Sequence, residues 1–430
     1  MSADYFLNKY EDLKSTWEKR SSSILALQDK AMEKYSALGL PTLKSEHWKY
    51  TPIAQRLLPS YETPKFVNVA IKKYKNQITL INGVFDKENT SVFDQGVQVF
   101  SLTQETLSPE QAEKIFFRLN CFEDGFEAAG LGLASDLIYI NATNKNTLES
   151  PLVIQQNYLA QKSSSMSHSN IYIEVEAGAS ILIILEDEYI RAQEFVSNHQ
   201  LYLNLGENAH VQLVQLVSGS ENYQYIGRIY AQQAKNSSFH ATVFTAGGKT
   251  LRCSTTVEQR GEAAETEVNG LYLVEGGEHV DHRIQVRHLV PQGQSRQLFK
   301  GVLKDSSRAV CNGKIYIAPG AQKVDSSQLN NNLVLSRHAE ADSKPELEVY
   351  ADDVKANHGS AIGRLDEDQL FYLMSRAVDR SMATKILAKG FVDEVLLKVR
   401  SNSLRTVAHH WLQQKLQDFQ ESLERSRSFQ

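Results

Sequence analysis

The feature that most restricts the fold is a stretch of about 200 residues, after Pro151, in which short apolar segments alternate with small or polar corners. Ile171, Ile173 and Val175 would share one face of a strand, since successive side chains point to opposite faces. A corner at residues 177–180 recurs at residues 207–210, and further corners are predicted at residues 236–238, 261–263, 305–307 and 357–359. Irregular coils of roughly 20 to 30 residues, stacked face to face, predict a β-solenoid.

Two other architectures could contain a succession of short strands. The segments between the predicted strands lack both the period and the length of helices, which excludes a doubly wound α/β sheet. An antiparallel sandwich has a similar strand pattern, and the pattern alone leaves that alternative open.

The stretch is flanked by helical patterns. Residues 4–38 are rich in helix formers and end before Gly39 and Pro41, which predicts a helix or helical hairpin. A further helix is predicted at residues 108–120, and residues 77–85 look extended. The chain therefore divides into an N-terminal helical or mixed region at 1–150, a mainly β core at 151–364 and a C-terminal helical domain at 365–430.

The C-terminal domain is predicted to contain three helices. Asp366 is the expected N-cap of the first helix and Ser381 that of the second, and the third runs through residues 404–419. With only the last coil expected beside them, these helices have a surplus apolar face that could bind a partner. The residues assigned to that face are Leu370, Phe371, Met374, Ile386, Leu387 and Phe391.

Charge and composition exclude several classes of protein. The chain has 46 Lys plus Arg against 51 Asp plus Glu, a net charge of −5, which argues against sequence-independent nucleic-acid binding. The apolar runs fall far below the roughly 20 residues of a membrane-spanning helix. Acidic residues near the N-terminus oppose a secretory signal, so we expect a cytoplasmic protein. The three cysteines are too few for a disulfide framework or a Cys-rich metal site.

Motifs for catalysis are weak. Residues 247–250 (GGKT) imitate the end of a phosphate-binding loop, but Val243 stands where that loop requires glycine, and no helical pattern follows. Residues 130–132 (GLG) resemble the start of a dinucleotide fingerprint, and we interpret them as a flexible turn. The sequence has no nucleophile elbow and no zinc-protease motif. We therefore expect a protein that is not an enzyme and that binds no nucleotide itself.

Histidines gather in residues 275–290. His279 and Asp281 would share one face of a strand and could form a metal pair with nearby Cys253 or Cys311. Most such histidines are hydrogen-bonded residues without a metal. The sequence leaves open whether His279 and His282 bind a metal or only form hydrogen bonds.

The strongest functional signal lies in residues 310–378. IYIAPGAQK at 315–323 is followed by QLNNNLVLS at 328–336, KPELEVYADDVK at 344–355, HG at 358–359 and GRLD at 363–366. This succession closely resembles the C-terminal half of the SufB and SufD family, scaffold subunits of the sulfur-mobilisation machinery for iron-sulfur clusters. LPTLKSEHWKYTP at residues 40–52 is similar to a segment typical of the SufD branch. The resemblance covers nearly the whole chain.

The resemblance implies a fold and partners. Members of the SufD branch have a right-handed parallel β-helix flanked by helical regions, pair with SufB through the β-helix and bind the ATPase SufC through the C-terminal helices. ATP hydrolysis would then belong to SufC. A homodimer is conceivable for the isolated chain.

The resemblance also implies a cluster ligand. In the family, the histidine of a Val-Lys-x-x-His-Gly segment lies at the SufB interface and is proposed to help hold the nascent iron-sulfur cluster; His358 is the matching position. Many relatives carry Cys two residues earlier, whereas this chain has Ala356. We therefore expect a transient cluster shared between subunits, with His358 from this chain and cysteines from SufB.

Two alternatives remain at this point. A β-helix enzyme that processes polysaccharides could use Asp281, Arg283 and Arg287 in an open groove. A purely structural subunit would position SufB and SufC without contacting iron, and His358 would then only shape a corner of the last coil.

Overall fold

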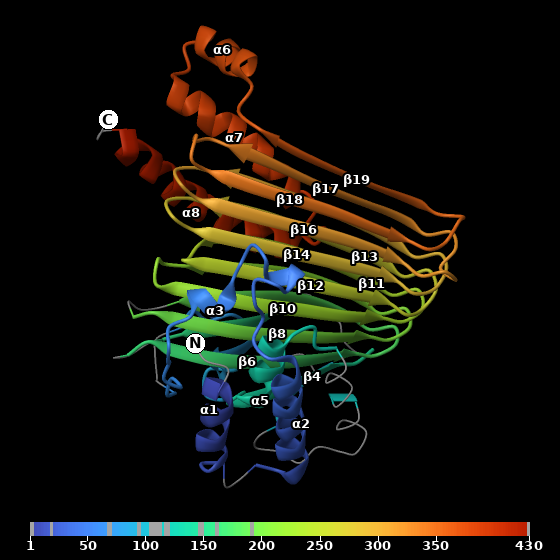
Figure 1. The fold of residues 1–430 in the computed structure, drawn as a ribbon. Helices are drawn as coiled ribbons and strands as arrows, with labels where there is room; N and C mark the ends of the chain where they lie inside the picture. Colours follow the sequence, from blue (N-terminus) through green and yellow to red (C-terminus); the bar gives the residue numbers. More distant parts are fainter. Residues whose placement is uncertain are drawn as a thin grey trace.

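Two sheets, parallel except for the antiparallel edge strands β2 (Val84–Phe85) and β3 (Val97–Ser101), are wound as successive coils and form the body of the molecule (Figure 1). The computed structural model describes residues 4–17, 20–66, 71–92, 96–102, 114–115, 121–144, 150–159, 163–189 and 193–427, with side chains up to residue 419. Sheet 1 has the spatial order β19 (Lys355–Gly363), β17 (Asp325–Val334), β15 (Gln294–Leu303), β13 (Glu265–Val274), β11 (Ser238–Gly247), β9 (His210–Gly219), β7 (Ser180–Tyr189), β5 (Leu152–Tyr158), β1 (Gln77–Ile81) and β2 (Val84–Phe85).

Sheet 2 lies opposite and has the order β18 (Glu340–Val349), β16 (Arg308–Ile317), β14 (His279–His288), β12 (Thr250–Gln259), β10 (Tyr223–Gln233), β8 (Phe195–Leu205), β6 (Ser165–Val175), β4 (Asp136–Ala142) and β3 (Val97–Ser101). From β4 onward each strand pairs in parallel with the strand two further along the chain. The predicted β-solenoid is therefore confirmed, and the antiparallel sandwich is excluded.

Each coil contributes one strand to each sheet and stacks on the next through its corners. Ser238 pairs with Glu265 and Gln294 with Asp325, so a coil in this part takes 27 to 31 residues. At one corner the backbone N–H of Gly178 donates to Glu207 in the next coil at 2.8 Å. This corner needs a positive φ, which Gly and Asn tolerate best; it is occupied in successive coils by Gly178, Asn208, Asn236, Ala263, Gln292 and Lys323.

The corner predicted at residues 357–359 is wrong. These residues lie inside β19, where His358 pairs with Gln328 and Gly359 with Leu329 of β17. Asn and Gly favour turns locally, but the ladder with β17 keeps the segment extended. Gly359 fits the strand because a Cβ there would lie 3.2 Å from Cδ1 of Leu329.

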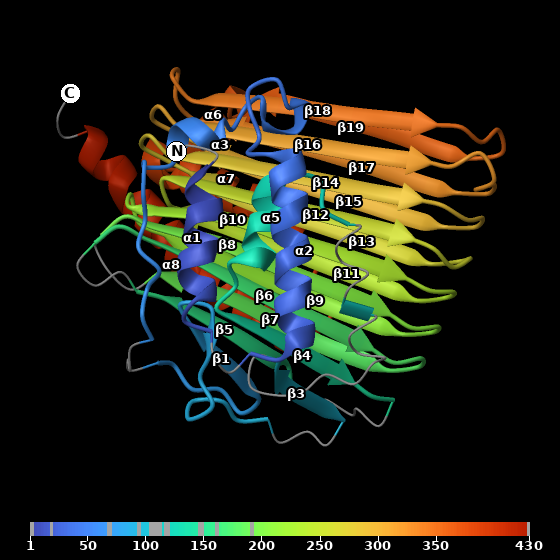
Figure 2. The ribbon, with the colours of Figure 1, turned by 60° about the horizontal axis from the view of Figure 1, so that its bottom comes forward.

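The N-terminal helices cover the outer face of sheet 2, mainly over the strands remote from β18 (Figures 1 and 2). The predicted hairpin is confirmed as α1 (Asp4–Lys14) and α2 (Ser22–Leu38), and short helices η1 (Glu46–Trp48) and α3 (Ile53–Arg56) follow. The helix predicted at 108–120 falls outside the described residues except for 114–115. β1 and β4, from the region before residue 151, already belong to the two sheets.

The expectation of a flexible turn at residues 130–132 is wrong. These residues form the end of the helix α5 (Gly125–Gly132). The glycines permit very close packing: a Cβ at Gly125 would lie 2.1 Å from the carbonyl oxygen of Gly39, and one at Gly130 would lie 2.3 Å from Nε2 of Gln200. The helix thus fits tightly between α2 and the outer face of sheet 2.

The C-terminal domain contains the three expected helices, α6 (Glu367–Ser375), α7 (Arg380–Leu396) and α8 (Asn402–Arg427). Asp366 caps α6 as predicted, accepting from the backbone N–H of Asp368 at 2.9 Å. The predicted cap Ser381 is wrong: Asp379 caps α7 by accepting from the backbone N–H of Met382 at 3.0 Å.

The expectation that only the last coil lies beside these helices is also wrong. α7 and α8 cover the outer face of sheet 1 over several coils, and Trp411 of α8 packs on Phe244 of β11 with ring centroids 6.2 Å apart. Lys304, fully buried, donates to the backbone oxygen of Phe419 and pairs with Glu275 at 2.7 Å. None of the described helices combines the length and apolar character needed to cross a membrane.

Candidate functional site

The solenoid ends openly at strands β18 and β19 (Figure 1). β19 pairs with β17 along one edge and β18 with β16, and in the described part of the chain their other edges have no partner strand. Such edges present backbone N–H and C=O groups that can pair with another chain. This end of the molecule is called the open end below.

His358 lies in the middle of β19 and is exposed to solvent. Because it is in register with Gln328, the two side chains leave the sheet on the same face, the one that looks toward the interior of the coil. Ala356, two residues earlier, shares that face. The imidazole is therefore presented at the uncapped opening of the solenoid rather than inside the core.

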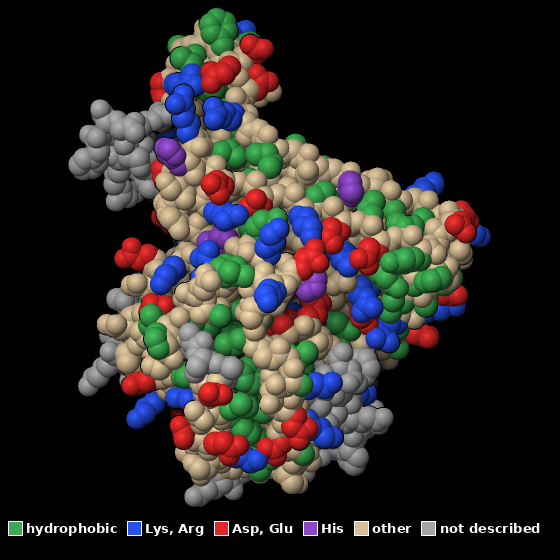
Figure 3. Space-filling view, viewed as in Figure 1, with side chains coloured by type: hydrophobic (Ala, Val, Ile, Leu, Met, Phe, Trp, Pro, Cys, Tyr) green, Lys and Arg blue, Asp and Glu red, His purple; other side chains and the backbone are tan. Residues whose placement is uncertain are grey.

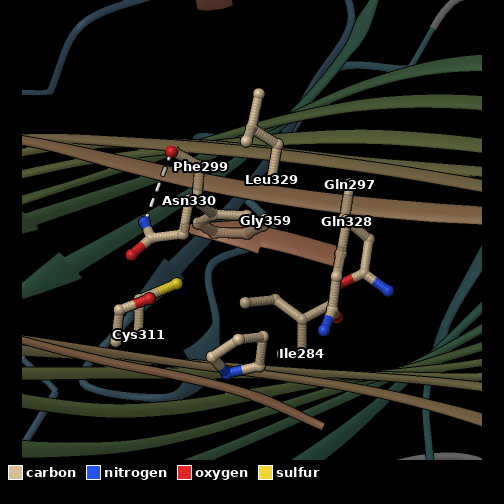
Figure 4. A pocket seen from close by; sticks show the side chains of 11 residues that line it. Ile284, Gln297, Phe299, Cys311, Gln328, Leu329, Asn330 and Gly359 are labelled. Carbon is tan, nitrogen blue, oxygen red and sulfur yellow. Dashed lines mark hydrogen bonds between the residues drawn. The ribbon is translucent and has the colours of Figure 1, made fainter. Parts of the chain in front are cut away.

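A small cavity, partly open to solvent, lies beneath the two terminal strands and is called the end cavity (Figure 4). Its lining includes Gln297 and Gln328 from sheet 1 and Cys311 from sheet 2, together with Ser343, Pro345 and Gly359 of the last coil. Burial raises the pKa of the Cys311 thiol, which keeps it protonated at neutral pH.

The outer side of β18 is covered by charged pairs with β16. Lys314 lies 2.7 Å from Glu348, and Arg308 lies 2.7 Å from Asp342. Charged side chains on a terminal strand oppose unspecific pairing of its edge. The open end is thus suited to a partner with a matching surface rather than to general aggregation.

The predicted metal pair is not assembled. His279 and Asp281 point to the outer face of sheet 2, whereas Cys253 and Cys311 are in register with His282 and face the core. The two sets leave opposite faces of one sheet because neighbouring residues of a strand alternate. Within the described residues no three His, Cys, Asp or Glu side chains are grouped to hold a metal ion.

His279 and Asp281 instead anchor residues 40–52. The hydroxyl of Thr51 donates to Asp281 at 2.5 Å and lies 2.8 Å from Nε2 of His279. Arg252 forms an ion pair with Asp281 and stacks 4.0 Å from the Trp48 ring centroid. Burial lowers the pKa of His279 to about 4. The segment that resembles the SufD branch thus holds the N-terminal region on the solenoid.

His282 lies inside the solenoid. Its ring stacks on Tyr272 at 5.3 Å, and its Nε2 lies 3.1 Å from the hydroxyl of Thr245. Burial lowers its pKa to about 4, so the imidazole is neutral at pH 7. We interpret it as a packed and hydrogen-bonded core residue.

The C-terminal helices carry an exposed apolar surface that projects beyond the last coil (Figure 3). Phe371 is 74% exposed, and Met374 and Ile386 are 42% and 43% exposed. Leu370 is buried at 1% exposure, and Leu387 and Phe391 are half-buried. Of the six residues predicted for a partner face, three are therefore freely accessible; neighbouring Tyr372 and Met382 extend the exposed surface.

The segment that imitates a phosphate-binding loop forms a tight turn. Gly247 and Gly248 have positive φ, and Thr250 begins strand β12 rather than a helix. Its backbone therefore lacks the helix N-terminus on which phosphate binding by such loops depends.

Sequence reasoning missed the end cavity. Its polar residues Gln297, Gln328 and Ser343 come from three different coils, and no local motif connects them. Aligning the coils by their corners would have placed Gln297 and Gln328 in one column, because they are paired in the structure.

Comparison with known proteins gives two matches to family models. Residues 158–391 match the SufBD core domain of the SUF system for FeS cluster assembly, and residues 1–154 match the N-terminal region of SufBD proteins.

Several individual proteins are similar over most of their length. The iron-sulfur cluster assembly protein SufD of Escherichia coli is 29% identical over 85% of this chain and 87% of its own. A SufBD family iron-sulfur cluster assembly protein of Synechocystis is 26% identical over 87% of both chains. The chloroplastic protein ABCI7 of Arabidopsis thaliana is 26% identical over 95% of this chain and 90% of its own.

Proposed function

Since the chain belongs to the SufBD family of the SUF system for iron-sulfur cluster assembly, we propose that it is a non-catalytic scaffold subunit of a SufB–SufC–SufD type complex. In this proposal a SufB-type subunit covers the open end and a SufC-type ATPase binds the C-terminal helices. The nascent cluster is the cargo of the complex and lies between this chain and the SufB-type subunit.

The observation that carries the proposal is the position of His358. It is exposed on the last strand, beside two edges that lack partner strands in the described chain. An exposed imidazole can ligate iron and is displaced more easily than a thiolate, which suits a cluster that must be passed on. Cys253 and Cys311 are buried, and the half-buried Cys121 belongs to the N-terminal region before α5, so thiolates for the cluster would come from the partner.

Binding of the ATPase is supported by the exposed face of α6 and α7. Phe371 and Met374 of α6 and Ile386 of α7 are exposed apolar side chains of the kind that anchors a partner protein. α7 and α8 are held on sheet 1, in part by the ion pair between Lys300 and Glu394. A movement of the bound ATPase would thus be transmitted to a rigid support.

The enzyme alternative has little support. Asp281 is 3% exposed beneath residues 40–52, and Arg283 is buried and pairs with Glu123 at 3.2 Å. Neither lies in an open groove where a polysaccharide could bind. The purely structural alternative shares the same assembly and differs only in the role of His358. We keep a cytoplasmic location as a prediction for this chain.

Reconstitution tests the proposed function. The chain is combined with SufB-type and SufC-type subunits, iron and a sulfide source, and the complex is isolated by size exclusion. We expect a ternary complex that holds more iron and acid-labile sulfide than the SufB-type and SufC-type subunits alone. Failure of the chain to enter the complex, or an unchanged cluster content, would contradict the proposal. A parallel assay for glycan cleavage should remain negative.

A further inference from the structure

Several polar atoms of the end cavity have no hydrogen-bond partner. Among the described residues, none bonds to Nε2 of Gln297, to either polar atom of the Gln328 amide or to Oγ of Ser343. Gln297 is 5% exposed and Gln328 is 6% exposed, so bulk water does not solvate them freely. Buried polar atoms are almost always paired in folded proteins, and a group of four unpaired atoms in one cavity indicates an absent occupant.

The chemistry of the lining selects a neutral occupant. The unpaired groups offer two amide NH₂ groups, one amide oxygen acceptor and one hydroxyl, whereas the lining contains no Lys, Arg, Asp or Glu. An ion would lose its hydration there without a counter-charge. A side-chain amide presents a donor and an acceptor together, and therefore complements Gln328 and its neighbours.

The place of the cavity selects the source of that amide. Ser343, Pro345 and Gly359 belong to the last coil and are half-buried, so the cavity lies directly beneath the opening. Gln328 is also the register partner of His358. Whatever protein covers the open end contacts both the imidazole and the cavity.

We propose that the end cavity receives an amide side chain, Asn or Gln, from the protein that covers the open end. The inference rests on the proposed function, because the occupant comes from the SufB-type subunit. The inserted amide would pair with Gln297, Gln328 and Ser343 and would fix the register of the two solenoids. His358 would thereby be placed at a reproducible position opposite the partner.

The test measures the stability of one double variant and its affinity for the SufB-type subunit. Gln297→Leu combined with Gln328→Leu keeps the volume of the side chains and removes their polar atoms. In the isolated chain we expect an unchanged or higher denaturation midpoint, because unpaired buried atoms are removed. For the SufB-type subunit we expect the Kd to rise roughly tenfold or more, because the inserted amide loses its partners.

Gln215→Leu is the matched control. Gln215 is a buried glutamine of β9, remote from the open end, and its Nε2 donates to the Tyr225 hydroxyl at 2.6 Å. This control should lower the denaturation midpoint and leave the Kd unchanged. Ser343→Ala, a smaller change in the end cavity, should raise the Kd by a few fold even if the double variant fails to fold.

The outcomes separate the possible failures. A more stable double variant that binds the SufB-type subunit with unchanged Kd would show that the cavity holds only water, and would overturn the amide proposal. An unchanged Kd for Ser343→Ala would count against it as well. If the wild-type chain does not bind the SufB-type subunit at all, the proposed function fails first, and the amide proposal falls with it.

Discussion

Arg252 and Asp281 form an ion pair that is almost completely buried between sheet 2 and the Trp48 ring. Burial alone would raise the pKa of Asp281, but the Arg252 guanidinium and the Thr51 hydroxyl hold it below its usual range. The pair thus connects the N-terminal segment to the solenoid through charges that cannot be solvated if one partner is lost.

We predict that Asp281→Ala lowers the free energy of unfolding by about 3–5 kcal/mol, because Arg252 is left buried and unpaired. Urea denaturation measures the loss. Lys389→Ala serves as the control: its partner Asp393 lies one turn further on the solvent-exposed side of the same helix at 2.6 Å, and such pairs contribute about 0.5 kcal/mol or less. Equal losses for the two variants would contradict the assigned role of the buried pair.

The buried His282 predicts a pH dependence of stability. Its pKa is lowered to about 4 in the folded chain, against about 6.5 when unfolded. The unfolded state therefore binds the proton first, and the contribution of His282 is complete above pH 6.5 and is lost as the pH falls toward 4. When the pH is lowered from 7 to 4.5, the free energy of unfolding of His282→Phe should fall by about 2–3 kcal/mol less than that of the wild type.

Urea denaturation at the two pH values checks this difference. The other buried histidines are unchanged in the variant and cancel in the comparison. If the free energy of unfolding changed with pH to the same extent in wild type and variant, the pKa of His282 would not be lowered in the folded chain, and this prediction would be contradicted.

Two neighbouring residues of α6 should respond differently to truncation. Leu370→Ala should lower the free energy of unfolding by about 2 kcal/mol or more, since Leu370 is buried. Phe371→Ala should change it by about 0.5 kcal/mol or less, since Phe371 is exposed. Binding to the SufC-type ATPase, measured by calorimetry, should be weakened strongly by Phe371→Ala. Full-strength binding by this variant would exclude the exposed face of α6 as the docking surface.

Ala356→Cys should strengthen retention of iron. The new thiol would leave β19 on the same face as His358, about 7 Å away along the strand, and thiolates are the preferred ligands of iron-sulfur clusters. Iron retained per reconstituted complex after gel filtration measures the effect. Asn357→Cys places its thiol on the opposite face and should retain no more iron than wild type.

The solenoid could be predicted because corners and alternating side chains repeat in each coil, and the helical regions because helix formers, stop signals and apolar stripes mark them. The corner at 357–359 was wrong because local turn propensity is weaker than pairing with β17. The metal pair with Asp281 was wrong because a shift of one residue moves a side chain to the other sheet face, and Cys253 is paired with His282.

The end cavity was not predicted because no local motif connects its residues. Its residues meet only when three coils of unequal length are stacked in register, and that register depends on the corners. The position of His358 was proposed from a resemblance, and its ligand role stays a prediction.

The most direct test of the central claim is a pulsed electron paramagnetic resonance measurement on the reduced cluster. The complex is assembled from unlabelled partners and a chain labelled with ¹⁵N-histidine. We predict a strong ¹⁵N coupling from a directly bound imidazole, present in wild type and in His338→Ala, an exposed control histidine, and absent in His358→Ala. A cluster that shows no ¹⁵N coupling, or the same coupling after His358→Ala, would contradict the account.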